Sequence, residues 1–504
     1  MLERYGVRCY NKRMYSIFFH FIQKIMLLLT AFWLWTTIHH LFVLSPWLGL
    51  GLLLVLGLAW YKKEHLEPGL KKLFAYKKTL LVLAILFQVA IILSANLLVR
   101  RDAAVVLNGA LELIEPSSIS NYLTRNPNNL FLFLYERFFY KLFGLNAIWV
   151  LQVLGLIYIN STAWILYKTG KLFSQRVADL VYLFYLLLMG VSPYVIQTYT
   201  DIAGLPFLAL QLYLILVAIK AEQASSRSML ILGLVTALAM SFRLTGIISI
   251  IAFFMLLFLS KEWKKMAKCL LIFGLSFGIS YGLQTYLQSA QTEVVIVKNE
   301  KLSKSWLTFI NLGLTYSGTD QEDMKRGLLQ YIPESEHDNY NNGMFANENE
   351  LKEIKRRLKG YTLVTFSEHL LYKFSRTVYD GTLNWIYLDP DKEKSAFISP
   401  LYQYTKDNAV AEWLRQTIIQ KDGKNFDLYR LVKQPIWVVV SLGLFLASWS
   451  YRKDRRVNVL LLSVFGGILF LMIFEGGKAR YLLQFLPQIL LLASLGWAGV
   501  KKEN

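Results

Sequence analysis

The chain has 504 residues, of which 55% are apolar and only 17% charged, and its formal net charge is +20. This composition departs from that of soluble globular proteins and predicts a multispan membrane protein. The positive charge does not indicate a nucleic-acid partner. The long polar segment 289–433 carries 20 basic and 20 acidic residues, so the excess lies elsewhere, much of it in short loops between apolar segments.

The apolar segments, taken in chain order, predict an all-α fold of about 12 transmembrane helices. Several of these segments reach the roughly 20 residues that are needed to cross a bilayer. The predicted spans are 19–44, 47–60, 79–99, 146–167, 177–193, 201–219, two short spans on either side of Arg243, 269–288, 434–450, 457–474 and 481–499.

Basic residues are concentrated in alternate loops between these spans. Six lysines lie between residues 61 and 78, and four more lie between 261 and 268. Because loops rich in Lys and Arg stay in the cytosol, twelve crossings place both termini there. The loops 100–145, 193–200 and 475–480 then share the outer face of the membrane with the segment 289–433.

This topology divides the chain into four regions. Residues 1–78 hold two N-terminal spans and a basic cytosolic loop, and 79–288 form a transmembrane core that includes the first outer loop. Residues 289–433 are long enough for an extracellular capping domain, in which helix and loop are favoured over sheet, so that we expect it to be mainly α or α+β. Residues 434–504 supply the last spans.

Asp102 follows Arg100 and Arg101 at the mouth of the third predicted span. A carboxylate at a membrane surface is expensive to desolvate, which makes it a candidate functional residue. The alternative is a solvated helix end, with the two arginines anchored at the interface.

Two further polar sites interrupt apolar sequence. Tyr199 and Asp201 stand at the outer end of the sixth span, where Asp201 could instead cap the helix. Arg243 lies between two short spans, and its planar guanidinium suits a phosphate group. The alternative for Arg243 is a structural ion pair with a buried carboxylate.

The last outer turn reads Glu-Gly-Gly-Lys-Ala-Arg-Tyr over residues 475–481. Two consecutive glycines allow the backbone to approach another group closely. A cationic pair at that depth would attract a lipid phosphate, although Lys, Arg and Tyr also serve as interfacial anchors. The candidate residues of this turn are Glu475, Lys478, Arg480 and Tyr481.

These landmarks resemble those of the GT-C glycosyltransferases, multispan enzymes that take a sugar from a polyprenyl-phosphate carrier. Asp102 stands where the family has an acidic residue in its first outer loop, and residues 122–144 (YLTRNPNNLFLFLYERFFYKLFG) are similar to its Tyr, Asn-Pro, apolar helix, Phe-Gly sequence. Tyr199-Thr200-Asp201 resembles the second acidic landmark, Arg243-Leu244-Thr245 the R/K-x-T motif, and Glu475 with Arg480-Tyr481 the terminal E…RY motif. The likeness covers roughly 79–288 and 434–499. It is strongest to bacterial members of Gram-positive type and to those related to protein O-mannosyltransferases and the aminoarabinose transferase of lipid A.

The resemblance implies an inverting sugar transfer to an extracytoplasmic acceptor, which would be a cell-wall glycopolymer, a lipid or a protein. Asp102 would be the catalytic base, and Asp201 and Tyr199 would hold the acceptor or orient other groups. Arg243, Lys478, Arg480 and Tyr481 would bind the lipid phosphate, supported by Glu475 and Arg101. Ala103 follows Asp102 where many members have a second acid, so a divalent metal is not supported and no cofactor is assigned.

Two alternatives remain at this stage. A transporter or flippase of lipid-linked saccharides would need its charged groups at mid-depth, whereas those of this chain lie at the outer face. A polymerase of lipid-linked saccharides would share the outer site with a single-sugar transferase.

Overall fold

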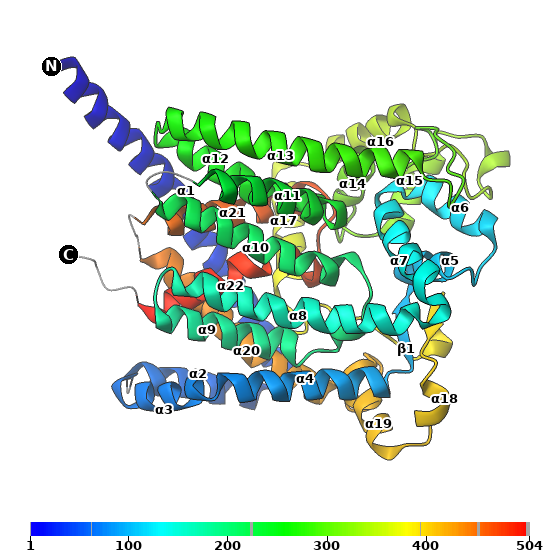
Figure 1. Cartoon of the computed structure of the whole chain (residues 1–504), viewed down its shortest axis with the longest axis horizontal. Helices are drawn as coiled ribbons and strands as arrows, with labels where there is room; N and C mark the ends of the chain where they lie inside the picture. Colours follow the sequence, from blue (N-terminus) through cyan, green and yellow to red (C-terminus); the bar gives the residue numbers. More distant parts are fainter. Residues whose placement is uncertain (1, 62, 222–224, 394, 451–453, 500–504) are drawn as a thin grey trace.

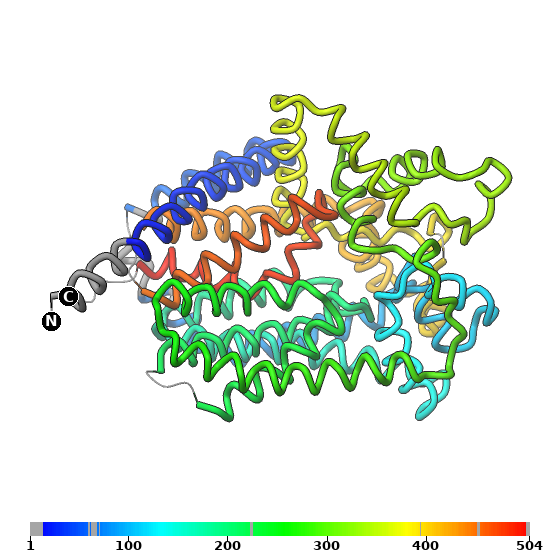
Figure 2. The backbone as a smooth tube through the Cα atoms, turned by 90° about the horizontal axis from the view of Figure 1, so that it is seen from above, coloured from blue at the N-terminus to red at the C-terminus, as the bar shows by residue number. Residues whose placement is uncertain are grey.

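The long helices lie side by side as one bundle, and most of the shorter elements gather at one end of it, whereas the short helix α3 (Lys63–Ala75) lies at the other (Figure 1). The computed structural model describes residues 2–499 except 62, 222–224, 394 and 451–453. The first helix begins and the last helix ends at the opposite end of the bundle (Figures 1 and 2). The loops that were predicted to share one face therefore share one end. Which side of the membrane they occupy stays a prediction.

Every predicted span overlaps a helix of this bundle. These helices are α1 (Leu2–Leu44), α2 (Pro46–Tyr61), α4 (Lys77–Ser94), α8 (Ala147–Lys171), α9 (Gln175–Tyr185) with its π-helical end η3 (Leu186–Gly190), α10 (Thr200–Lys220), α11 (Ser226–Phe242), α12 (Ile247–Leu259), α13 (Trp263–Ala290), α20 (Phe426–Trp449), α21 (Arg455–Ile473) and α22 (Leu486–Ala498). Within the described residues, eight segments are long and apolar enough to cross a membrane, and three shorter apolar helices accompany them. The number of twelve crossings stays a prediction.

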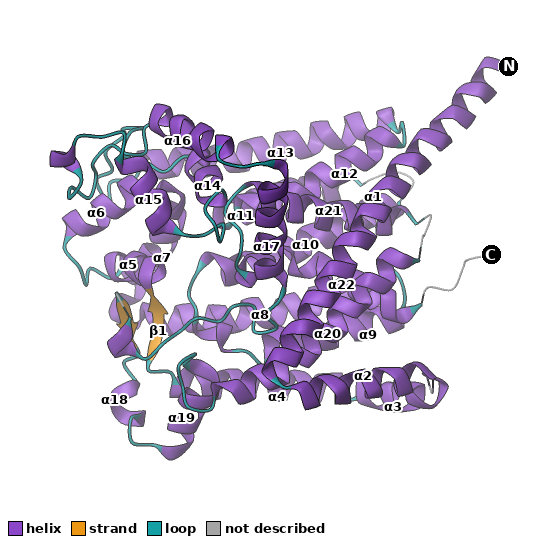
Figure 3. Ribbon diagram, turned by 180° about the vertical axis from the view of Figure 1, so that it is seen from behind, coloured by secondary structure: helices purple, strands orange, loops and turns teal. Residues whose placement is uncertain are grey.

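The third predicted span is shorter than expected, because α4 ends at Ser94 and the chain continues as strand β1 (Leu97–Arg100). This strand pairs antiparallel with β2 (Ala396–Ile398), with Leu97 opposite Ile398 and Arg100 opposite Ala396 (Figure 3). Hydropathy alone could not distinguish a strand from the end of a helix at these residues, since a short apolar run suits a buried strand as well as a helix. The pairing joins parts of the chain about 300 residues apart.

The first outer loop is a group of short amphipathic helices. It contains α5 (Arg101–Ala110), α6 (Pro116–Arg125), η1 (Pro127–Asn129), α7 (Leu130–Phe143) and η2 (Gly144–Asn146). Their apolar faces form a small core of their own, which includes Val106, Ile119, Leu123 and Phe133. This core holds α5, the helix of Asp102, against α7.

The segment 289–433 combines short helices and loops with the strand β2, and whether it forms a separate extracellular domain stays a prediction. Its other elements are α14 (Trp306–Gly313), α15 (Gln321–Leu329), η6 (Glu334–Glu336), α16 (Asn347–Lys359), α17 (Leu363–Val378), η7 (Pro390–Lys392), α18 (Tyr402–Thr405), α19 (Ala409–Leu414) and the π-helical turn η8 (Arg415–Ile419). Its first half buries two small apolar clusters, one around Leu328 and one around Leu307. Its second half, including Phe374, Trp385 and Ile419, belongs to the main core of the bundle.

Irregular backbone inside the bundle is satisfied by polar side chains. Lys433 of α20 is buried and donates hydrogen bonds to the carbonyl oxygens of Leu187 and Leu188 in η3. Gln88 of α4 donates to the carbonyl of Gly190 at 2.9 Å. An apolar environment tolerates free carbonyls only when such partners exist. These contacts fix the end of α9, from which η4 (Pro193–Ile196) leads to the candidate site.

Candidate functional site

Asp102 is presented by a strained turn between β1 and α5. Arg101, the first residue of α5, has a φ of +50°, a conformation that residues other than glycine seldom adopt. Its backbone N–H donates to the carbonyl of Ser395 at 2.8 Å, so the segment that contains β2 holds the turn in place. Arg100 points into the protein, where it forms a buried ion pair with Glu393. Asp102 itself stays exposed at the start of α5.

Asp201 lies between two guanidinium groups. It is in the first turn of α10 and only 5% exposed. Its Oδ1 accepts a hydrogen bond from Nη2 of Arg243, and its Oδ2 lies 3.5 Å from Nε of Arg480. Arg243 comes from the break between α11 and α12, which is followed by the short turn η5 (Leu244–Gly246). One carboxylate therefore holds two cations from distant elements in a common position.

The ring of Tyr199 lies beside both guanidinium groups. The guanidinium carbons of Arg243 and Arg480 are 5.7 Å and 6.0 Å from the centroid of its ring. Burial, together with the nearby Asp102 carboxylate, raises the pKa of Tyr199 to about 12 in spite of the two arginines. The phenol is therefore neutral at physiological pH and can donate a hydrogen bond to a bound group.

The turn 475–481 is clasped by the segment 289–433. Gly477 has a φ of +72°, and its N–H donates to Oγ1 of Thr377 at 3.0 Å. A Cβ atom on Gly477 would lie 2.0 Å from the carbonyl oxygen of Ser317. The N–H of Gly476 donates to the carbonyl of Gly318 at 3.0 Å. The two glycines thus permit a close backbone approach that no other residue would allow.

This turn supplies both acidic and basic groups. Glu475 accepts hydrogen bonds from the hydroxyl of Tyr481 and, at 3.4 Å, from Thr319. Arg480 and Tyr481 belong to η9 (Ala479–Phe485), the helical turn before α22. The guanidinium carbon of Arg480 lies 5.8 Å from the ring centroid of Tyr481. Arg480 therefore points toward Asp201, whereas Glu475 pairs with Tyr481.

Lys478 interacts electrostatically with both Asp102 and Arg480. Burial lowers the pKa of Lys478, partly offset by the neighbouring carboxylates of Glu475 and Asp102, and the charge of Arg480 lowers it further. The charge of Arg101 also lowers the pKa of Lys478. Asp102 and Arg480 thus both act electrostatically on Lys478 and on Tyr199.

The structure brings all nine predicted site residues to one end of the bundle. They are Arg101, Asp102, Tyr199, Asp201, Arg243, Glu475, Lys478, Arg480 and Tyr481. Asp201 is not a helix cap through its side chain, because its carboxylate is paired with the guanidiniums. Arg243 forms the ion pair with a buried carboxylate that the alternative from the sequence expected, and its partner is Asp201. This pairing is compatible with a role of Arg243 in binding.

Sequence reasoning missed Lys304, which the loop before α14 brings to the site. Its ammonium group interacts electrostatically with Asp102 and Glu475, and burial lowers its pKa. Arg125 lies nearby, with its guanidinium carbon 3.6 Å from the ring centroid of Tyr340. Lys304 stands in a loop without periodicity or motif, so no local pattern could have identified it.

No metal site is evident in the described part of the chain, where no three His, Cys, Asp or Glu side chains come together in a group that could hold an ion. The cations around Asp102 and Asp201 instead favour binding of an anion. We therefore assign no residue to a metal.

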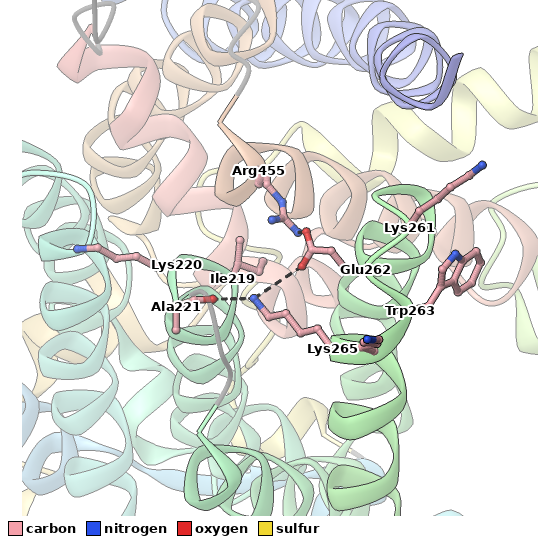
Figure 4. A pocket seen from close by; sticks show the side chains of 9 residues that line it. Ile219, Lys220, Ala221, Lys261, Glu262, Trp263, Lys265 and Arg455 are labelled. Atoms are coloured by element: carbon pink, nitrogen blue, oxygen red, sulfur yellow. Dashed lines mark hydrogen bonds and ion pairs between the residues drawn. The ribbon is translucent and has the colours of Figure 1, made fainter. Parts of the chain in front are cut away.

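A cavity of about 700 Å³ lies at the opposite end of the bundle and contains none of the predicted site residues. Figure 4 shows Arg455 and Lys265 pointing toward the carboxylate of Glu262, while Lys220 points away. Lys265 also donates to the carbonyl of Ala221 at 2.6 Å. These contacts tie α10, α13 and α21 together, which is a structural role.

Comparison with solved structures gave two matches, both to ArnT from Cupriavidus metallidurans. The structure bound to undecaprenyl phosphate is 13% identical with a TM-score of 0.37, and the apo structure is 14% identical with a TM-score of 0.30. Each alignment covers 84% of this chain and 78% of the other. TM-scores this low do not establish a shared fold. Comparison with curated protein sequences gave no match.

One family model matches residues 10–501, almost the whole chain. Its description, "Conserved hypothetical integral membrane protein", agrees with the bundle of apolar helices. The chain belongs to this family of integral membrane proteins.

Proposed function

We propose that the protein is an inverting glycosyltransferase that moves a sugar from a polyprenyl-phosphate carrier to an acceptor hydroxyl. The observation that carries the proposal is the contrast between two carboxylates at one end of the bundle. Asp201 is buried between two guanidiniums, whereas Asp102 is exposed beside lysines. Different environments suit two carboxylates to different roles, here a structural anion and a proton acceptor.

In this mechanism Asp102 takes the proton of the acceptor hydroxyl as its oxygen attacks the anomeric carbon. The new bond to the acceptor forms while the bond between that carbon and the phosphate oxygen breaks. The electron pair of the broken bond leaves with the polyprenyl phosphate. Proton removal by a positioned base typically contributes 10²- to 10⁴-fold to the rate.

The leaving phosphate gains negative charge, which the cations of the site would stabilise. Arg480, Arg243 and Lys478 are the groups we assign to this role, and Tyr481 would join them by turning its hydroxyl from Glu475 to the phosphate. Asp201 holds both guanidiniums in position, and the ring of Tyr199 lies beside them. Fixed cations need no reorganisation when the charge develops, which is why a preorganised group accelerates such a step.

The rest of the assignment follows from this site. We place the site on the outer face, with both termini in the cytosol, because the basic loops lie at the opposite end. The segment 289–433 would contact the acceptor, which we assign to the class of cell-wall glycans, lipids or proteins. The lipid tail of the donor would lie against the apolar helices.

The proposal is tested with purified protein in vesicles that contain a polyprenyl-phosphate-linked hexose. Asp102→Asn is expected to lower transfer at least about 100-fold, because the amide cannot accept the proton, and to leave binding of polyprenyl phosphate largely intact. Glu115→Gln, an equal change at an exposed position of the same loop, is the control.

Three results would count against the proposal. Full activity of Asp102→Asn would remove Asp102 from the role of base. Movement of the labelled lipid across the bilayer without consumption of its sugar would indicate a flippase, and a ladder of products would indicate a polymerase.

A further inference from the structure

Glu136 is a buried carboxyl group next to the candidate site. It lies on α7 with an exposed fraction of 0%, and neither of its carboxylate oxygens has a hydrogen-bond partner within the described part of the chain. Arg137, the next residue, does not pair with it. The guanidinium of Arg137 instead binds Glu112, Glu293 and the carbonyl of Ala110.

A small cavity adjoins Glu136 beneath the turn that carries Tyr199. Its volume is about 20 Å³, and its lining includes Glu136, Thr198 and Tyr199. Oγ1 of Thr198 is also buried without a hydrogen-bond partner among the described residues. A cavity needs roughly 10 to 15 Å³ and two or more polar partners to hold one water molecule. This cavity meets both requirements.

The rest of the lining provides hydrogen-bonding groups but no cation. The hydroxyls of Tyr135 and Tyr158 are 2.8 Å apart, so one of the two donates to the other and one hydroxyl hydrogen remains for a further acceptor. Leu132, Leu151 and Ile202 form apolar walls. A carboxylate ion would have no counter-ion here, and burial favours the neutral acid over an unpaired ion.

We propose that Glu136, as a neutral carboxylic acid, and Thr198 hold one ordered water molecule beneath Tyr199, and that Glu136 is thereby a positioning residue for the site. The water ties α7 to the extended turn before α10. That turn is otherwise held by backbone contacts, such as the bond from the N–H of Tyr199 to the carbonyl of Gln197 at 2.9 Å, and by the side chain of Gln152, which donates to the carbonyl of Ile196 at 2.9 Å.

The consequence for catalysis rests on the proposed function. Tyr199 packs against both guanidiniums, and Asp201 follows it by two residues. A shift of the turn would move Asp201 and the two cations together. Misplacement of catalytic groups by about 1 Å can cost a factor on the order of 100 in rate.

The first test does not depend on sugar transfer. The infrared difference spectrum of the wild type minus Glu136→Gln, in lipid at neutral pH, is expected to show the carbonyl stretch of a protonated carboxylic acid. The corresponding difference for Glu368→Gln, which changes an exposed carboxylate, is expected to lack it. An ionised carboxylate signal from Glu136 would overturn the proposal. So would a high-resolution experimental structure of the wild type without density for a water between Glu136 and Thr198.

The second test uses the transfer assay and a pair of variants. Glu136→Gln keeps a hydrogen-bonding group of the same size and is expected to rescue most of the turnover that Glu136→Leu loses. The loss in Glu136→Leu should be roughly tenfold to 100-fold in kcat. Equal loss in both variants would overturn the positioning role, because it would mean that the site needs the acid itself.

Thr198→Val provides a second variant in case Glu136→Leu does not fold. It removes the other partner of the water and is expected to lower kcat in the same direction, and unchanged kcat would overturn the proposal. If the wild type transferred no sugar at all, the proposed function would fail while the infrared and structural tests of the water site would still decide this inference.

Discussion

At the scale of single residues, the site depends on how charge is balanced between two carboxylates. Asp201 is buried and compensates Arg243 and Arg480, whereas Asp102 is exposed and faces Lys304 and Lys478. The sequence identified Asp102, Asp201 and both arginines as polar residues in apolar surroundings. It could not identify their partners, since Asp201 and Arg480 are 279 positions apart.

The buried pairing leads to a prediction for Asp201→Ala. The substitution leaves two guanidiniums without their counter-charge, and breaking a buried ion pair costs about 3 to 5 kcal/mol. Because both arginines are partly exposed, we expect the lower end, about 3 kcal/mol. Thermal unfolding in detergent measures the change, with Glu115→Ala as an exposed control. Equal stability of the two variants would contradict the pairing.

The backbone of Arg101 allows a second prediction at this scale. Arg101→Gly and Arg101→Ala remove the same charge, but only glycine adopts a φ of +50° without strain. We expect the glycine variant to be more stable than the alanine variant by about 1 kcal/mol. Because both variants lack the charge, the difference between their free energies of unfolding measures the backbone strain alone. A more stable alanine variant would show that the turn is not strained.

At the scale of elements, two pairings outside the helices build the site. The β1–β2 pairing ends at Arg100, two residues before Asp102, and the turn 475–481 is clasped by the segment 289–433. The sequence predicted the helices and the break at Arg243 from hydropathy and charge, which are local properties. It placed residues 95–99 in a span, whereas Leu97–Arg100 form a strand, because pairing with Ala396–Ile398 is a long-range event.

The close packing of the turn 475–481 against the segment 289–433 predicts that Gly477 does not tolerate a side chain. In Gly477→Ala the new Cβ would lie 2.0 Å from the carbonyl oxygen of Ser317, in a backbone conformation that alanine disfavours. We expect a loss of at least about 2 kcal/mol in the free energy of unfolding, together with loss of activity. Gly278→Ala, in α13 with nothing within 4 Å of its Cβ, is the matched control and should be neutral or slightly stabilising. Similar melting of the two variants would show that the turn is not tightly clasped.

At the scale of the whole molecule, the segment 289–433 is joined to the bundle through a buried lysine. Lys373 of α17 has an exposed fraction of 0% and donates hydrogen bonds to the carbonyls of Gly313, Met472 and Phe474. Gly313 belongs to the segment 289–433, while Met472 and Phe474 lie at the end of α21. Burial lowers the pKa of Lys373 from its ordinary value of 10.5 to about 7, partly offset by Glu475.

This pKa predicts how stability depends on pH. Between about pH 7 and pH 10 the unfolded chain binds a proton at Lys373 that the folded protein does not, so stability rises with pH in this range. The contribution is on the order of 2 kcal/mol between about pH 7 and pH 9. Below about pH 7 the folded protein holds Lys373 as a buried charged amine, so the full free-energy cost of that burial lowers its stability.

The pH dependence is measured by comparing unfolding curves of the wild type and Lys373→Met. We expect a smaller rise in stability with pH in the variant, whatever its absolute stability, since its side chain does not titrate. Other lysines with lowered pKa values, such as Lys304 and Lys478, contribute equally to both proteins. An identical pH dependence would show that Lys373 is not the titrating group.

The sequence by itself determined that this is a helical membrane protein with a cluster of charged residues in the loops of one end. Hydropathy sets which segments leave water, and the alternation of basic loops sets which loops share an end. Only the tertiary structure decided which charges meet, that Lys304 and the strand β2 join the first outer loop, and that Glu136 is enclosed beneath Tyr199. The physical reason is that hydropathy and charge patterns are properties of neighbouring residues, whereas ion pairs, strand pairs and cavities form between segments that only the packed chain brings together.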